Sequence, residues 1–162
     1  MARKVFFSFH FANDFWRTQQ VRQMNALEGN PLATANAWEE VKRKGDDSIK
    51  KWIADEMTGR SCIIVLVGSE TAARKWVKYE IEKAWKDNRA VLGIRIHNLL
   101  DTASKPSPMG ANPFEGITVG TTKLGQAVPL KNPSGADSKA VYATIASNIE
   151  AWIEEAIERR KA

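Results

Sequence analysis

The stretch Cys62–Val67 reads CIIVLV and is the strongest structural signal in the chain. A continuous apolar run of this length, with turn residues on both sides, is typical of a strand buried on both faces of a parallel sheet. A turn at residues 68–71 follows, and a helix is expected to begin near Arg74. Residues 3–9 and 90–96 are also rich in β-branched, aliphatic or aromatic side chains. They predict two further strands, one before and one after Cys62–Val67 in the chain.

Helices are expected between these strands, because apolar residues recur there at helical spacing. The first should be capped by Asn13 or Asp14 and run to about residue 27. The others are expected at residues 46 or 47 to 58, 74 to 86, and 137 to 159. Residues 32–38 are a weaker candidate for a second strand near the sheet edge, and residues 126–130 for a short last one.

The alternation of strand and helix with short connections predicts an α/β fold of the flavodoxin-like class. We expect a doubly wound parallel sheet of about five strands in the order 2-1-3-4-5, with helices on both faces. The 162 residues should form a single domain. Residues 98–125 are rich in Pro, Gly, Ser, Thr and Asn, and so long a connection predicts a functional flap or a mobile loop.

Composition narrows the class of protein. Cys62 is the only cysteine, which excludes an internal disulfide and favours a reducing cytoplasmic compartment. The apolar run after the basic N-terminus is too short for an export signal, and no stretch approaches the length of a membrane span, so we expect a soluble protein. The net charge of +5 is scattered among 19 acidic residues, which fits solvated faces or a small anionic ligand better than nucleic acid. The two histidines have no metal-ligand spacing, so no metal is expected.

Glu80 is the anomaly of the sequence. It lies on the same helical face as Trp76 and Ala84, in an otherwise apolar stripe, whereas Glu82 points elsewhere. A carboxylate on a buried face needs either a cationic partner or a function. Spacing alone leaves both readings open: a helix-edge glutamate neutralised by a neighbouring Lys or Arg, or a carboxylate that faces a ligand.

Ligands of doubly wound sheets bind outside the carboxyl ends of the strands, where the strand order reverses. Other candidates should gather with Glu80 at this crevice, and they are Ser8, Phe9, His10, Asn13, Asp14, Trp38, Ser69 and Trp76. Simpler interpretations remain open for three of them. His10 could be a structural histidine, Asp14 a helix cap and Trp76 a core residue.

Three segments together carry a resemblance to a known family. They are RKVFFSF at residues 3–9, CIIVLVGSET at residues 62–71 and, above all, WVKYEI at residues 76–81. They resemble the bacterial TIR-like domains, in particular the TIR-like component of the Thoeris anti-phage defence system. The usual motif has cysteine after the tryptophan, where this chain has Val77. Residues 98–126 have no counterpart in the resemblance.

The resemblance implies an enzyme that cleaves NAD between nicotinamide and ribose, with Glu80 as the essential residue. NAD would be a substrate rather than a permanently bound cofactor, and Phe9, Trp38 or Trp76 could pack against its rings. Attack by water would give ADP-ribose, whereas attack from within the same molecule would give a cyclic ADP-ribose isomer. Such a product would act as an immune signal to a separate effector protein, and self-association or a phage-derived trigger could control the enzyme.

Two alternatives belong to other classes. Many TIR-type domains are non-enzymatic adaptors that assemble through loops and helix faces, and residues 42–47 would supply such a contact loop. Glu80 would then make a structural salt bridge. A nucleoside-modifying enzyme of related architecture could also use a lone glutamate, but the sequence offers no second acid or base for it.

Overall fold

A computed structural model describes residues 3–24, 27–29, 41–100 and 105–161. Its main sheet has five strands in the order β2-β1-β3-β4-β7, and every neighbouring pair is parallel. The strands are β1 (Arg3–Ser8), β2 (Leu27–Gly29), β3 (Cys62–Val67), β4 (Ala90–Arg95) and β7 (Leu130–Lys131). The predicted order 2-1-3-4-5 and the doubly wound class are therefore confirmed.

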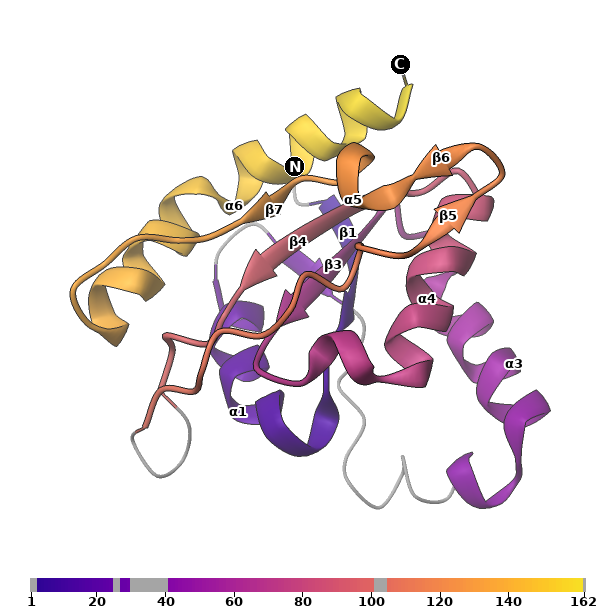
Figure 1. Cartoon of the computed structure of the whole chain (residues 1–162), viewed down its shortest axis with the longest axis horizontal. Coiled ribbons are helices and arrows are strands. Elements are labelled where there is room, and N and C mark those ends of the chain that lie inside the picture. Colours follow the sequence, from indigo (N-terminus) through magenta and orange to yellow (C-terminus); the bar gives the residue numbers. More distant parts are fainter. Residues whose placement is uncertain (1–2, 25–26, 30–40, 101–104, 162) are drawn as a thin grey trace.

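Helices cover both faces of this sheet (Figure 1). The helices α1 (Phe11–Arg22) and α6 (Ser138–Lys161) lie on one face, and α3 (Asp46–Met57) and α4 (Lys75–Lys86) on the other. A short 3₁₀ turn, η1 (Thr71–Ala73), connects β3 to α4. All six residues of β3 are buried, as its unbroken apolar sequence predicts. None of the helices formed by the described residues is both long and apolar enough to cross a membrane.

Strand β1 shows how the two faces are assigned. Val5 and Phe7 belong to the core on the α1 and α6 side, whereas Phe6 belongs to the core on the α3 and α4 side. Side chains alternate along a strand, so Ser8 at the end of β1 shares the face of Phe6. That face carries α4 and therefore Glu80.

The first helix and the second strand differ from the prediction. Helix α1 begins at Phe11, with His10 rather than Asn13 or Asp14 in the N-cap position, and it ends at Arg22. Strand β2 occupies residues predicted to be the end of that helix. Three residues are too few to show strand periodicity, which explains the error. The strand predicted at residues 32–38 lies outside the described residues.

The last part of the segment expected to be a flap or mobile loop contains regular secondary structure from Thr118 onward. Strands β5 (Thr118–Val119) and β6 (Thr122–Lys123) form an antiparallel pair, followed by α5 (Leu124–Ala127). Phe114 is fully buried in the core on the α4 side, where its ring lies so close to Gly93 that a side chain there would clash. The predicted last strand at residues 126–130 is displaced, because α5 reaches Ala127 and β7 begins at Leu130.

Candidate active site

Ser8, the last residue of β1, meets Glu80 of α4. The Ser8 hydroxyl donates a hydrogen bond of 2.7 Å to Oε1 of Glu80, although 72 positions separate the two residues in the chain. Ser8 is 1% exposed and Glu80 is 8% exposed. The parallel sheet places this pair beside the β1–β3 boundary, where the strand order reverses. The carboxylate that interrupts the apolar stripe of α4 therefore lies at the predicted switch point.

The environment of Glu80 strongly disfavours its charge. Burial raises the pKa of this carboxyl from 4.5 to about 8, and the hydrogen bond from Ser8 opposes that rise. Within the described part of the chain, no lysine or arginine forms an ion pair with Glu80. The described residues thus give no support to the interpretation of Glu80 as half of a structural salt bridge. A buried carboxyl with a raised pKa at a sheet switch point is typical of a functional group.

His10 lies two residues beyond Ser8, and its ring contacts the start of α4. Its Nε2 is 3.2 Å from Nη1 of Arg74, the N-cap residue of that helix. Burial and then the charge of Arg74 lower the pKa of His10, while Asp14 and Glu70 oppose the shift. Ser8 and His10 of the N-terminal segment therefore each pair with a residue at or within α4.

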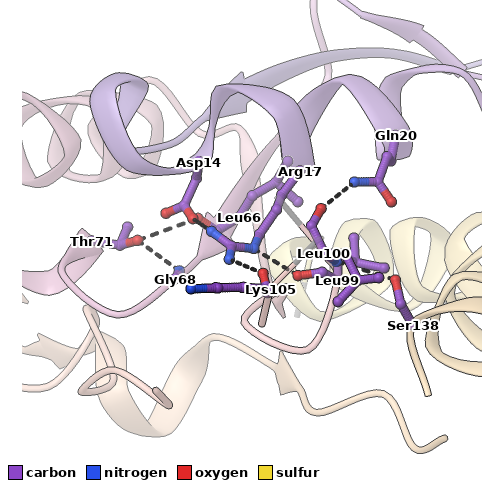
Figure 2. Close-up of polar contacts among 10 residues, drawn as sticks. All are labelled: Asp14, Arg17, Gln20, Leu66, Gly68, Thr71, Leu99, Leu100, Lys105 and Ser138. Atoms are coloured by element: carbon purple, nitrogen blue, oxygen red, sulfur yellow. Dashed lines mark hydrogen bonds and ion pairs between the residues drawn. The ribbon is translucent and has the colours of Figure 1, made fainter. Parts of the chain in front are cut away.

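Asp14 and Arg17 form a buried ion pair on α1 (Figure 2). Nη1 of Arg17 lies 2.9 Å from Oδ1 of Asp14, and both side chains are at most 3% exposed. Arg17 also donates hydrogen bonds to the carbonyls of Leu99, at 2.8 Å, and Lys105, at 3.0 Å. Asp14, predicted to be a cap or a ligand residue, is therefore part of a buried network that ties α1 to the segment after β4.

The same network contacts the turn that follows β3. The Asp14 carboxyl lies against Gly68 so closely that no side chain would fit at that position. Burial raises the pKa of Asp14, and the hydrogen bond and charge of Arg17 oppose the rise. On the other side, Gly110 packs against the backbone of Gly68 and Ser69. Ser69 is half-buried in this turn.

Two aromatic candidates lie on opposite layers. Phe9 packs against the core on the α1 and α6 side, away from the face that carries Glu80. Trp76 packs at the edge of the other core and lines an open groove of about 560 Å³ between α3 and α4. Its ring meets that of Tyr79 edge-on, with 5.4 Å between the centroids. Trp38 and the side chain of Asn13 lie outside the described residues.

Two charged residues of this region were not predicted from the sequence. Arg74 resembles an ordinary solvated residue before a helix, and only the fold brings it to His10. Arg17 lies on the same helical face as the buried Val21 and Met24, but a charged side chain on that face was not taken as buried. The sequence held a signal for Arg17 in this stripe and in Asp14, which precedes it by three residues, a spacing at which helical side chains meet.

Comparison with known proteins places these residues in a family. Residues 6–101, more than half of the chain, match the family described as "Thoeris protein ThsB, TIR-like domain". The chain belongs to this TIR-like family. The matched span contains Ser8, His10, Arg74 and Glu80, so the whole β1–α4 junction lies within the family region.

One curated relative of this TIR-like chain is a protein of Bacillus cereus (strain MSX-D12). Its name is "Putative cyclic ADP-D-ribose synthase ThsB1", and it is 36% identical over 121 residues. The alignment covers 71% of this chain and 62% of the relative. The chain therefore spans less than two thirds of the length of that protein.

Proposed function

We propose that this TIR-like protein cleaves NAD at the bond between nicotinamide and ribose, with Glu80 as the essential carboxylate. The observation that carries the proposal is the buried Ser8–Glu80 pair at the switch point of the sheet. Family membership and the name of the Bacillus cereus relative support NAD as the substrate.

The chemistry needs little more than such a carboxylate. When the glycosidic C–N bond breaks, its electron pair leaves with the pyridinium ring, and nicotinamide departs as a neutral molecule. No general acid is required, so the second carboxyl of an ordinary glycosidase can be absent. The ribose carbon becomes oxocarbenium-like, and a carboxylate that binds the ribose hydroxyls in a site with little water stabilises this charge.

Substrate binding would also change the protonation of Glu80. In the free protein the pKa of about 8 leaves this carboxyl mostly protonated at neutral pH. The pyridinium ring of NAD carries a positive charge, and a nearby cation favours the ionised carboxylate. The Ser8 hydrogen bond acts in the same direction. The carboxylate would thus become ionised as the cation it must stabilise arrives.

The final product depends on which group attacks the ribose carbon. Water gives ADP-ribose, whereas a hydroxyl or ring nitrogen of the same molecule gives a cyclic isomer that contains one water less. An attacking water or hydroxyl releases its proton in either case. The name of the relative favours cyclisation. We propose that the cyclic product is a diffusible signal to a separate effector protein, and that a phage-derived trigger or self-association activates its synthesis.

The test is consumption of NAD by the purified chain, alone and with extract from infected cells. Chromatography separates nicotinamide from the nucleotide products. Mass measurement then distinguishes ADP-ribose from its cyclic isomer, which contains one water less. Glu80→Gln should lower the rate by about 100-fold or more, the size expected for loss of an electrostatic transition-state group. Glu82→Gln is the matched control on the same helix, where Glu82 lines the α3–α4 groove, and it should act like the unmodified protein.

Two results would overturn the proposal. One is a Glu80→Gln variant that consumes NAD as fast as the unmodified protein. The other is no NAD loss in any condition, including the infected extract. If the chain assembles in that extract without NAD loss, and assembly and signalling survive Glu80→Gln, the adaptor alternative is favoured.

A further inference from the structure

We propose that His10 is a positioning residue that holds Ser8 against Glu80. It does so by joining the start of α4 to the buried ion pair of α1. The inference rests on the proposed function for the role of Glu80, but the contacts that carry it can be tested without NAD.

The contact with Arg74 fixes which nitrogen of His10 carries the proton. A guanidinium group can only donate, so the 3.2 Å contact makes Nε2 of His10 the acceptor from Nη1 of Arg74. The neutral ring then carries its proton on Nδ1. This nitrogen is buried, and it has no hydrogen-bond partner among the described residues. Because the two ring nitrogens point in different directions, the partner of Nδ1 has to come from the side away from Arg74.

Asp14 supplies the complementary atom on that side. Its Oδ1 lies 2.9 Å from Arg17, whereas its Oδ2 is buried and has no partner within the described part of the chain. The backbone N–H of Asp14 donates a 2.8 Å hydrogen bond to the carbonyl of His10, so both residues belong to the first turn of α1. The charges of the two side chains act on each other. Glu70 also acts on His10, but it is exposed and Nδ1 is buried.

A buried donor and a buried acceptor on one helical turn are natural partners, because buried polar groups are rarely left unpaired. The bond is direct or runs through one shared water, and in both cases Nδ1 carries the proton. The Asp14 carboxyl lies against Gly68 so closely that a side chain there would clash, so it has little room to turn away. Arg17 extends these contacts to two backbone carbonyls after β4 (Figure 2). We call the series Arg74, His10, Asp14 and Arg17 the His10 contact chain.

The His10–Arg74 contact is the second of two clamps between the end of β1 and α4. The first is the 2.7 Å hydrogen bond from Ser8 to Glu80. Ser8 and His10 are two residues apart, or about 7 Å in extended backbone. Arg74 and Glu80 are six residues apart, or about 9 Å along a helix axis. One clamp lets two segments pivot about it, whereas two separated clamps fix their orientation. His10 therefore acts on Glu80 through Ser8 and needs no contact with the substrate.

Titration of the free protein is the first test and requires no NAD. The ¹³C signal of the Glu80 carboxyl, identified by its loss in Glu80→Gln, gives the pH at the midpoint of its ionisation. His10→Asn keeps an N–H near the Nδ1 position but gives Arg74 no acceptor. The midpoint should then rise above about 8, because the Ser8 hydrogen bond that opposes the rise is weakened. His10→Gln places a carbonyl near the Nε2 position and should restore the original midpoint.

A double variant shows whether His10 acts through Ser8. In a Ser8→Ala background, His10→Asn should cause no further rise of the Glu80 midpoint, because no Ser8 hydrogen bond remains to be weakened. Lys78→Gln removes an exposed cation of α4 and should leave the midpoint unchanged. An unchanged midpoint in His10→Asn, or an equal further rise in the Ser8→Ala background, would refute the positioning role.

Ring ¹⁵N signals test the contact chain itself. The chain has two histidines, so His97 serves as the internal reference. His10 should be in the Nδ1–H form. Asp14→Asn should shift its Nδ1 signal more than its Nε2 signal, and Arg74→Met should do the reverse. An Nε2–H form of His10, or an Nδ1 signal that does not respond to Asp14→Asn, would show that the chain of contacts is wrong.

Kinetics then separate this proposal from the proposed function. His10→Asn and Arg74→Met should each lower kcat/KM for NAD at pH 7 by about fivefold or more, the effect of weakening one hydrogen bond. If these variants consume NAD as fast as the unmodified protein, the positioning role is refuted and the proposed function stands. If the ¹³C and ¹⁵N results hold but the protein never consumes NAD, the contacts are supported and the proposed reaction is refuted.

Discussion

Glu80 is held in a state that an exposed glutamate does not adopt. Its carboxyl is buried, receives one hydrogen bond from Ser8, and has a pKa of about 8. The same burial that suppresses its charge in the free protein would strengthen its interaction with a cationic transition state. The protonation state of this one residue is therefore the property by which the proposed function can be examined most directly.

The pH dependence of activity should follow the ionisation of Glu80. If the carboxylate form is active, kcat/KM rises about tenfold per pH unit and levels off near pH 8, because this constant reports the pKa of the free enzyme. Rates with NAD from pH 5.5 to 9 provide the measurement. A flat profile across this range would show that ionisation of Glu80 does not limit the reaction.

Ser8→Ala should move that profile to higher pH. The Ser8 hydroxyl donates to the carboxylate and lowers the pKa of Glu80, so its removal leaves burial unopposed. The plateau rate should change less than the midpoint of the profile. A Ser8→Ala variant whose midpoint falls or stays unchanged would contradict the role given to this hydrogen bond.

The stability of the fold should depend on pH through the same carboxyl. The folded pKa of about 8 lies above the reference value of 4.5, so between these values the folded state binds more protons than the unfolded state. The contribution of Glu80 to the free energy of unfolding is therefore complete below pH 4.5. It is lost at up to about 1.4 kcal/mol per pH unit as the pH rises toward 8.

Urea unfolding between pH 4.5 and 8 can measure this contribution. Glu80→Gln cannot ionise, so its stability relative to the unmodified protein should increase steadily as the pH rises. Glu82→Gln should keep the slope of the unmodified protein. If the free energy of unfolding changed with pH in the same way in all three proteins, the pKa of Glu80 would be the same in the folded and unfolded states.

At the residue level, the sequence was sufficient to point to one part of the candidate site. Glu80 could be found because a carboxylate interrupts an apolar stripe, which is a local pattern. The contact of His10 with Arg74 could not be found this way, because 64 positions separate these residues and each alone resembles an ordinary polar residue. The fold class was predictable, whereas side-chain partners across elements depend on the packing of that fold.

Among the elements, α1 does more than cover the sheet. Arg17 ties this helix to the backbone after β4 through Leu99 and Lys105, and Gln20 adds a hydrogen bond of 2.8 Å to the carbonyl of Leu100 (Figure 2). Asp14 on the same helix packs against Gly68 at the end of β3. Helix α1 thus fixes how the segments after β3 and β4 leave the sheet.

Arg17→Met should destabilise the fold by about 3–5 kcal/mol, because the buried Asp14 carboxyl loses its partner. Combining it with Asp14→Leu should cost less than the two single changes added together, since no unpaired charge then remains buried. Urea unfolding of the two single variants and the double variant gives the coupling. Strict additivity would show that the pair contributes nothing beyond its separate packing.

Strong apolar runs allowed most elements to be predicted. The six-residue strands β3 and β4 and the helices α3, α4 and α6 lie close to their predicted positions. The predicted start of α1 was wrong. Asn and Asp are common N-cap residues, but His10 occupies the N-cap position here and makes no side-chain cap hydrogen bond. Strands β2 and β7 have three and two residues, and their positions follow from pairing with β1 and β4 rather than from local sequence.

In the whole molecule, the region between β4 and α6 completes the core. Phe114, Ile117 and Leu124 are buried with residues of β3 and α4. A prediction based on composition emphasised the Pro, Gly and Ser content here and overlooked these few apolar residues. Their positions have no regular period, so only the folded structure shows that they share one side of the sheet.

Phe114→Ala should therefore destabilise the protein by about 3–5 kcal/mol, as expected for removing a fully buried aromatic ring. Met109→Ala, in the same segment but 57% exposed, should change stability by no more than about 0.5 kcal/mol. Thermal or urea unfolding can compare the two. A small effect of Phe114→Ala would mean that this segment does not belong to the cooperative core.

The Ser8–Glu80 contact also has a consequence for how the protein is made. The hydroxyl comes from strand β1 and the carboxyl from helix α4, 72 positions later, so no short piece of the chain holds both. A ribosome must release at least residues 3–86 before the two groups can meet. On the proposed function, nascent chains and proteolytic fragments that lack either end would leave the NAD of the cell untouched.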